Sequence, residues 1–332
     1  MRSIIAAILL ALWLPSPGPA QDLMLPPVST YSIVARDSVT GEMGVAVQSH
    51  YFSVGPIVPW AEAGVGAVAT QSLVDPSYGP LGLELMRVGR SAPDALRALV
   101  SIDAQKEVRQ VAMIDAEGRV AAHTGKNAIE AAGHSFGSQY SVQANLMERA
   151  TVWDAMAAAY ETAEGDLAER LLCALEAAEA EGGDIRGRQS AALLIVSATS
   201  TGQPWEDRLF DLQVEDHPTP VAELRRLVQV RRAYHHLDEA GRWAAGKDWA
   251  KANTAIDRAT SIIPDSATNG EIAFWAGIEL VLAERVSEAL PYLVRAYRQD
   301  SRWAEVVVRI SAAGIVPDDR SLIDRLLAGM KE

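Results

Sequence analysis

The chain has 332 residues and a mass of 35.7 kDa, and 43 Asp and Glu against 30 Lys and Arg give it a net charge of −13. This length suits about two domains with sizeable cores, and 49% hydrophobic with 22% charged residues is typical of globular proteins, which excludes a disordered or fibrous chain. An acidic chain repels phosphate backbones, so nucleic-acid binding by bulk electrostatics is excluded. The single cysteine excludes an internal disulfide and a thiolate zinc cage.

The first twenty residues have the order of a secretory signal peptide. A basic residue precedes the apolar run 4–14, and the small residues Gly18 and Ala20 follow at positions that suit signal peptidase. The run is too short for a membrane-spanning helix with ordinary flanks. We therefore expect residues 1–20 to be removed, so that the mature chain starts at Gln21 and is periplasmic or secreted, with no membrane contact. An uncleaved signal anchor is the less favoured alternative.

The next part of the chain, from residue 29 to about residue 214, contains both strand and helix patterns. Two hairpins and three further strands are predicted, at 30–37 with 43–49, 108–115 with 119–125, 64–72, 189–198 and 207–215. Four helices are predicted, at 81–89, 92–100, 151–163 and 166–182. Because strands and helices come in separate runs, the sequence predicts an α+β domain in which two hairpin-rich sheets are covered by helix pairs.

After Pro220 the chain becomes almost entirely helical and contains a weak internal repeat. Residues 248–267 align with 285–304 at an offset of 37, with alanine on alanine at positions where helices would cross. Small residues there let antiparallel helices approach closely, and a period near 34 residues is typical of tetratricopeptide repeats. We therefore predict an all-α, tetratricopeptide-like domain over 221–332, with a generic alanine-rich bundle as the alternative.

No motif in the sequence indicates a cofactor or a metal. The six histidines are scattered without HExxH spacing, and there is no nucleophile elbow, no dinucleotide-binding loop that opens a helix and no Walker loop. Cys173 lies in the apolar helical run 171–178, which favours a small buried side chain over a catalytic thiol. We therefore expect no cofactor and no metal.

Four segments of the first domain together resemble one family. They are 30–49, 55–80, 118–125 and 183–196. Over about residues 30–227 they resemble the domain of unknown function family 1028, which is placed among the N-terminal-nucleophile (Ntn) hydrolases. The resemblance implies a four-layer αββα sandwich over 30–220, in agreement with the strand and helix patterns, and it leaves the reaction open.

The resemblance implies a nucleophile at the head of the first strand, where Thr30 stands. In Ntn hydrolases the first residue of the mature chain attacks a carbonyl, and its own α-amine, which titrates near pH ~8, acts as the base. Signal cleavage leaves residues 21–29 in front of Thr30 as a linker or propeptide. A second cut after Ser29, autocatalytic or not, is therefore required for catalysis. The alternative is that Thr30 is only a β-branched strand residue.

Other polar residues near the ends of the predicted strands are candidates for supporting roles. His50 is expected to handle protons beside Thr30, and Asn145 to donate a hydrogen bond to an oxyanion. Five residues are candidates for binding the substrate or its carboxylate: Ser49, Gln71, Ser72, Arg186 and Arg188. A half-buried structural histidine and a surface ion pair for the arginines are the plainer alternatives.

These features give two hypotheses. The first is an exported hydrolase that acts on small-molecule or peptide amides. In it, the helical domain binds a protein partner or cell-wall material, and the resemblance points to peptidoglycan. The second is a catalytically inactive αββα sandwich that acts as a periplasmic binding or scaffold protein. The mature N-terminus separates them, because only a chain that begins at Thr30 carries the required amine. Both leave the oligomeric state open.

Overall fold

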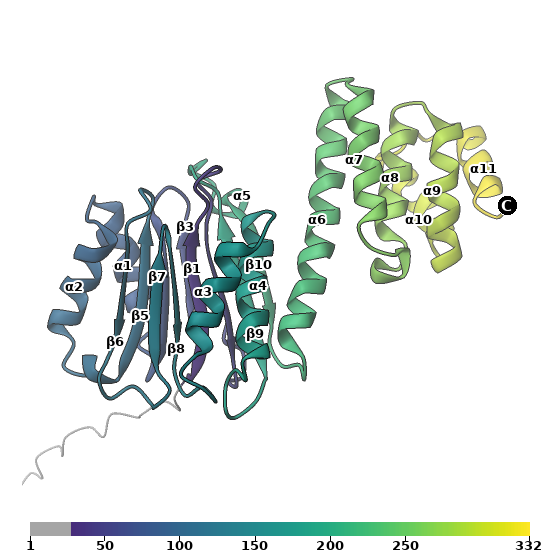
Figure 1. Ribbon diagram of the computed structural model, residues 1–332. Helices are drawn as coiled ribbons and strands as arrows, with labels where there is room; N and C mark the ends of the chain where they lie inside the picture. Colours follow the sequence, from purple (N-terminus) through teal and green to yellow (C-terminus); the bar gives the residue numbers. More distant parts are fainter. Residues whose placement is uncertain (1–27) are drawn as a thin grey trace, which may run out of the picture.

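The computed structural model describes residues 28–332 (Figure 1). The predicted signal peptide, 1–20, and residues 21–27 lie outside this range. An α+β domain comes first, and a helical region follows from the start of α6 (Pro220–Ala245). The predicted α+β class and C-terminal helical region are therefore confirmed. Within the described range, no helix combines the length and the apolar character needed to cross a membrane.

The larger sheet of the α+β domain has six antiparallel strands in the order β10-β9-β2-β1-β8-β7. Their bounds are β1 Thr30–Arg36, β2 Met43–Ser49, β7 Gly133–Gly137, β8 Tyr140–Ala144, β9 Ser190–Val196 and β10 Arg208–Val214. The predicted hairpin joins β1 to β2, and its register places Thr30 opposite Ser49. The carboxylate of Asp37 holds the turn, since it accepts the backbone N–H groups of Val39 and Thr40, each at 2.8 Å.

The smaller sheet has four antiparallel strands in the order β3-β4-β5-β6. Their bounds are β3 Pro59–Glu62, β4 Gly66–Ser72, β5 Arg109–Asp115 and β6 Val120–Thr124. The second predicted hairpin is the pair β5 and β6. Both sheets of the domain are thus hairpin-rich, as the strand patterns predict.

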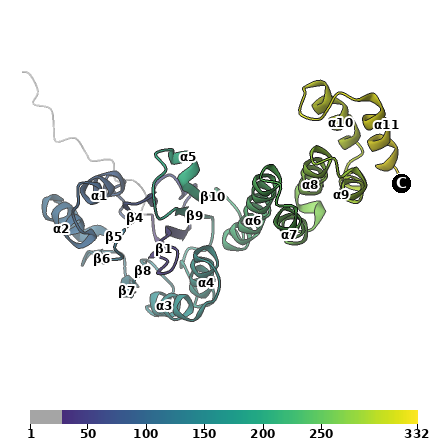
Figure 2. The ribbon, with the colours of Figure 1, turned by 90° about the horizontal axis from the view of Figure 1, so that it is seen from above.

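Two helix pairs cover the outer faces of the two sheets (Figure 2). Their bounds are α1 Tyr78–Arg87, α2 Ala92–Ile102, α3 Val152–Thr162 and α4 Leu167–Ala180. The pair α1 and α2 packs on β4 and β5, whereas α3 and α4 pack on the six-stranded sheet. The inner faces of the sheets meet in a third apolar cluster, to which Val34, Val45 and Ala69 belong. The layer order is therefore helices, sheet, sheet, helices, as Figure 2 shows from above.

The first half of α6 packs on the α+β domain. Val221, Leu224 and Val228 are fully buried in the cluster that also contains α4. The two helices also share a polar contact, in which Arg225 of α6 donates to Glu169 of α4 at 2.6 Å. The helical region therefore starts as part of the sandwich's own core.

Cys173 lies on α4 and is half-buried, whereas the apolar run 171–178 predicted a buried side chain. Its sulfur is 3.9 Å from Glu169 Oε1 and 3.9 Å from a guanidinium nitrogen of Arg225. Partial burial, together with the charge of Glu169, raises the pKa of the thiol above its usual range. Cys173 therefore faces the contact between α4 and α6 as a protonated, weakly nucleophilic thiol.

The contact between α4 and α6 leads to a pH-dependent prediction. Burial raises the pKa of Glu169, but hydrogen bonds from Arg225 and Arg232 outweigh it and hold the pKa below its ordinary value. A lowered carboxyl pKa gives stability that is present above the unfolded-state pKa, about 4.3, and is lost as the pH falls through the folded-state pKa. Glu169→Gln is expected to lower the free energy of unfolding by about 1–2 kcal/mol at pH 7, and by less in acid.

Urea unfolding at pH 7 and at pH 3.5 measures this effect. Glu164→Gln is the matched control, because Glu164 is exposed in the loop before α4 and the same change there leaves the α4–α6 contact untouched. If Glu169→Gln lowers the free energy of unfolding equally at both pH values, the charge of the carboxylate does not stabilise the packing of α6.

Five further helices continue the helical region. They are α7 Trp249–Ser261, α8 Glu271–Leu282, α9 Val286–Gln299, α10 Trp303–Ala312 and α11 Arg320–Gly329. The two segments of the internal repeat form α7 and α9, and the aligned Ala259 and Ala296 are both fully buried. In Figure 1, α6 and α7 form one antiparallel pair, and α8 and α9 form the next. The aligned alanines thus lie between packed helices, where small side chains allow the helices to approach closely.

Candidate functional site

The candidate site lies where β1 begins, at the junction of the two sheets. Val28, just before β1, pairs with Ser72 at the end of β4 through two backbone hydrogen bonds. The Val28 N–H donates to the Ser72 carbonyl at 2.8 Å, and the Ser72 N–H donates to the Val28 carbonyl at 2.9 Å. Val28, Ser29 and Thr30 are all fully buried. The Ser29–Thr30 peptide bond therefore runs from one sheet to the other inside the protein.

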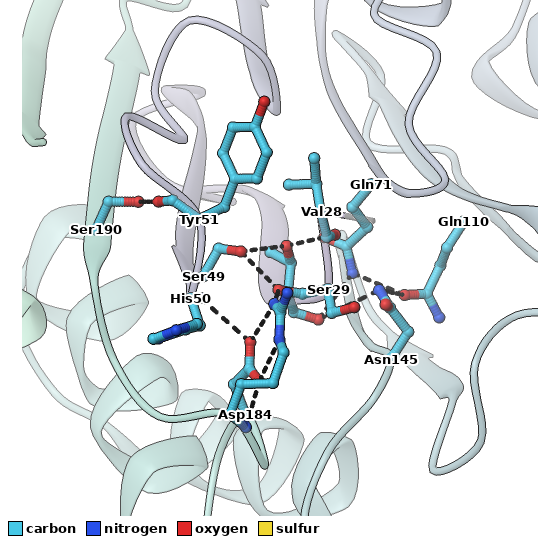
Figure 3. Close-up of polar contacts among 12 residues, drawn as sticks. Val28, Ser29, Ser49, His50, Tyr51, Gln71, Gln110, Asn145, Asp184 and Ser190 are labelled. Atoms are coloured by element: carbon cyan, nitrogen blue, oxygen red, sulfur yellow. Dashed lines mark hydrogen bonds and ion pairs between the residues drawn. The ribbon is translucent and has the colours of Figure 1, made fainter. Parts of the chain in front are cut away.

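The Thr30 hydroxyl lies between an oxygen atom of the segment before β1 and one of the neighbouring strand β2. It donates to the carbonyl oxygen of Val28 at 2.7 Å, and its oxygen is 3.1 Å from Oγ of Ser49. Ser49 in turn donates to the carbonyl oxygen of Ser29 at 2.6 Å (Figure 3). The approach of Ser49 to Thr30 follows from the β1–β2 register, since directly opposite residues present their side chains on the same face of a sheet.

A guanidinium group supplies a second donor to the same carbonyl. Nη2 of Arg186 donates to the Ser29 oxygen at 2.9 Å. The buried carboxylate of Asp184 holds this arginine through Nε at 3.1 Å and Nη2 at 2.7 Å. One hydroxyl and one cation thus point at the carbonyl that precedes Thr30. Such a pair of fixed donors stabilises negative charge on a carbonyl oxygen.

The carbonyl of Thr30 itself is held by the other sheet and by the end of β8. It accepts from Nε2 of Gln71 at 3.2 Å, from the backbone N–H of Asn145 at 3.1 Å and from Nδ2 of Asn145 at 3.5 Å. Oε1 of Gln110 accepts from Gln71 at 2.7 Å and from Asn145 at 3.0 Å, which fixes both amides (Figure 3). Asn145 therefore contacts the carbonyl of Thr30 itself, and its role as a donor to the oxyanion of a substrate stays a prediction.

Comparison with known proteins shows to which family the chain belongs. The model of the family of unknown function DUF1028 matches residues 30–224, more than half of the chain. The chain belongs to the DUF1028 family. The match begins at the first residue of β1. Among the curated proteins, none matches the chain.

A solved DUF1028 structure supports the assignment. The crystal structure of protein SPO2555 from Silicibacter pomeroyi is 29% identical to this chain, with a TM-score of 0.55. The likeness covers 60% of this chain and 85% of that chain. Most of that protein is thus matched, whereas two-fifths of this chain has no counterpart in the comparison. The resemblance of the first domain to DUF1028 is confirmed.

Three polar atoms near the head of β1 are buried without a hydrogen-bond partner in the part of the chain that the structure describes. They are Oγ of Ser29, Oγ of Ser72 and Oδ1 of Asn145. Buried polar atoms usually have partners, because leaving one unpaired costs about 1–3 kcal/mol. Each of these atoms can therefore still take a hydrogen bond from a water or a ligand.

Two of the residues predicted from the sequence are not brought to Thr30. The His50 ring points away from the contacts of Ser49 in Figure 3, and its backbone N–H donates to Asp184 at 3.2 Å. Arg188 forms an ion pair with Glu179 of α4, with Nε and Oε1 3.4 Å apart. Burial raises the pKa of the Glu179 carboxyl, while Arg188 opposes that rise. Arg188 thus serves an ion pair with α4, and Nδ1 of the His50 ring is buried with no hydrogen-bond partner among residues 28–332.

The structure places the other candidates together and adds two that the sequence patterns missed. Five of the predicted residues contact Thr30 or the segment before it: Ser49, Gln71, Ser72, Asn145 and Arg186. Ser72 does so through its backbone. The missed residues are Gln110 and Asp184. Gln110 could have been noticed as the one polar residue of a strand face that continues with Ala112 and Ile114. Asp184 carries no such local signal.

The described residues offer no cluster for a metal. Between Val28 and the C-terminus, no three His, Cys, Asp or Glu side chains come together in a way that could hold an ion. The chemistry available at the head of β1 is that of hydroxyls, amides, one guanidinium and the carboxylate of Asp184 that holds it.

Proposed function

We propose that the chain is an exported Ntn-type hydrolase of amide bonds, in which a cut after Ser29 frees Thr30 as the nucleophile. The observation that carries the proposal is the pair of donors, Ser49 and Arg186, on the Ser29 carbonyl next to the Thr30 hydroxyl. The layer order of helices, sheet, sheet and helices also supports it, because Ntn hydrolases are αββα sandwiches with the nucleophile at the head of a strand.

The cut needs no group from outside the chain except water. Oγ1 of Thr30 attacks the carbonyl carbon of Ser29, the bond from that carbon to the Thr30 nitrogen breaks, and the hydroxyl proton ends on the nitrogen. The charge that develops on the Ser29 oxygen is stabilised by Ser49 and Arg186. Water then hydrolyses the ester, which leaves a carboxylate on Ser29 and a free α-amine on Thr30.

The freed amine lets the same hydroxyl act on other amides. The amine takes the hydroxyl proton as Oγ1 attacks a substrate carbonyl, and the proton passes to the departing amine. Water hydrolyses the acyl-enzyme and restores Thr30. Gln71 and Asn145 hold the Thr30 carbonyl throughout, so the amine and the hydroxyl keep a fixed position.

The helical region forms the second part of the proposal. We infer a tetratricopeptide-like module that binds a protein partner or peptidoglycan, since α7 and α9 repeat one helix-packing pattern around buried alanines. The competing function is an inactive sandwich that acts as a periplasmic binding or scaffold protein. In that case Thr30 would stay in peptide linkage, and its hydroxyl contacts would serve the fold alone.

The mature N-terminus tests the proposal. Intact-mass spectrometry of the chain exported by its native host is expected to show a chain that begins at Thr30, and this material is expected to hydrolyse amides. A chain that begins at Gln21 and is inactive would favour the scaffold function. A chain that keeps residues 21–29 and still hydrolyses amides would exclude Thr30 as the nucleophile.

A further inference from the structure

We infer that the substrate is a peptide amide whose acyl part ends in a small residue, preceded by a small aliphatic one. It would bind where Val28 and Ser29 now lie. The inference rests on the proposed function and names its substrate class. It is carried by the contacts that hold Val28 and Ser29 against Ser72, Ser49 and Arg186.

The cut and the hydrolysis pass through the same kind of ester. When Thr30 attacks Ser29, the carbonyl carbon of Ser29 becomes bonded to Oγ1 of Thr30. When Thr30 attacks a peptide that ends in Val-Ser, the ester formed has the same acyl group at the same atom. The groups that hold Val28 and Ser29 for the first reaction therefore also fit the last two residues of such a substrate.

The backbone contacts select for a peptide. Ser72 donates its N–H to the Val28 carbonyl and accepts the Val28 N–H, at 2.9 and 2.8 Å. A ligand satisfies both only if it has an N–H and a carbonyl on the residue before the reacting one, as an added β-strand does. An acyl chain without that second amide would leave the buried N–H of Ser72 unpaired. The end of β4 is thus suited to an extended peptide.

The side-chain positions set the size of the last two residues. Val28 is fully buried in the apolar cluster between the sheets, which also contains Val54 and Val74. This position fits a valine-like side chain and excludes a charged one. Ser29 is fully buried as well, so a Lys or Phe side chain would not fit. Because Oγ of Ser29 has no partner among residues 28–332, alanine should fit this position at least as well as serine.

Peptide amides of 7-amino-4-methylcoumarin test the inference on the exported full chain, after its N-terminus has been read by mass. The first probes are acetyl-Pro-Val-Ser and acetyl-Pro-Val-Ala amides. Three matched probes carry Lys in the last position, Arg in the second-last position, or a hexanoyl group in place of the peptide. We expect kcat/KM for the Ser and Ala probes to exceed that of each matched probe by about 10-fold or more.

The rate of the cut after Ser29 offers a second measurement of the same preference for small residues at positions 28 and 29. In the full chain, Ser29→Ala is expected to be cut as fast as the parent, and Ser29→Phe and Val28→Arg at least about 10-fold more slowly.

The outcomes separate the inference from the function on which it rests. Cutting at Thr30 with equal hydrolysis of all probes, with preference for the hexanoyl probe, or with no hydrolysis of any peptide probe, would overturn the inference and leave the cut intact. Absence of both the cut and any hydrolysis would overturn the proposed function and the inference together.

Discussion

Replacing Thr30 by alanine is expected to leave the sandwich folded and to abolish both the cut after Ser29 and amide hydrolysis. The change removes the attacking oxygen, and loss of a nucleophile lowers such rates by at least about 10⁴-fold. The lost contacts are one hydrogen bond to Val28 and the approach to Ser49, which cost about 1 kcal/mol. The pairing of β1 with β2 and β8 uses backbone atoms and is unaffected.

Two variants control this experiment. Thr70→Ala makes the same chemical change at a buried threonine of β4, whose hydroxyl donates to the Asp75 carbonyl at 3.1 Å, and should leave the cut and the hydrolysis unchanged. Thr30→Ser keeps a hydroxyl in place and should retain the cut. Intact mass, amide hydrolysis and circular dichroism measure the three effects. Unchanged hydrolysis in the Thr30→Ala variant would remove Thr30 from the mechanism.

Most strands and helices of the α+β domain follow from local patterns in the sequence. In β1, Val34 faces the other sheet and Ile33 faces α4, so the strand is apolar on both faces and easily recognised. The start of α2 is equally local, because Ser91 caps it by accepting the N–H of Asp94 at 3.2 Å, with proline in the first turn.

Two strands lack such a pattern. β3 has four residues and begins at a proline, and β7 consists of Gly-His-Ser-Phe-Gly. Neither shows the apolar alternation from which a strand is predicted, and both lie at an edge of their sheet. Their pairing with β4 and β8 depends on the neighbouring strand rather than on their own sequence.

The candidate site shows the same division between local and distant information. Ser49 could be predicted beside Thr30 because a hairpin fixes which residues lie opposite each other. The contact of Gln110 with Asn145 joins different sheets, and no local pattern specifies it. Adjacent residues also separate, since the Ser49 hydroxyl points to Ser29 whereas the His50 ring points away (Figure 3).

Arg186 and Arg188 are two residues apart and yet contact different parts of the domain. Gly187, between them, has φ of 112°, a conformation that favours glycine, so the chain does not continue there as a regular strand. Arg186 reaches the Ser29 carbonyl, and Arg188 reaches Glu179 on α4. The sequence could not assign them different roles, but their separation makes them a matched pair for an experiment.

Arg186→Gln is expected to slow both the cut and the hydrolysis by about 10²–10³-fold, as removal of one oxyanion donor does in other acyl-transfer sites. Arg188→Gln makes the same change in charge and size two residues away. It loses an ion pair with α4 in which Arg188 is half-exposed and which does not touch Thr30 or Ser29, so its rates should stay within about 2-fold of the parent. Measuring kcat and KM separately shows where the loss falls. A donor to the developing oxyanion should lower kcat more than it raises KM.

Stability must be separated from catalysis in this comparison, because Arg186 also neutralises a buried carboxylate. The Asp184 side chain is fully buried, and without its cation the folded state loses about 3 kcal/mol or more. Arg186→Lys keeps the charge beside Asp184 and one donor toward Ser29, but loses the two-point contact, so intermediate rates and near-parental thermal stability are expected. Arg186→Gln, Asp184→Asn removes both charges together and should regain stability without regaining rate. If that double variant folds and cuts at the parental rate, the guanidinium is not an oxyanion donor, and Ser49 would have to stabilise the charge without it.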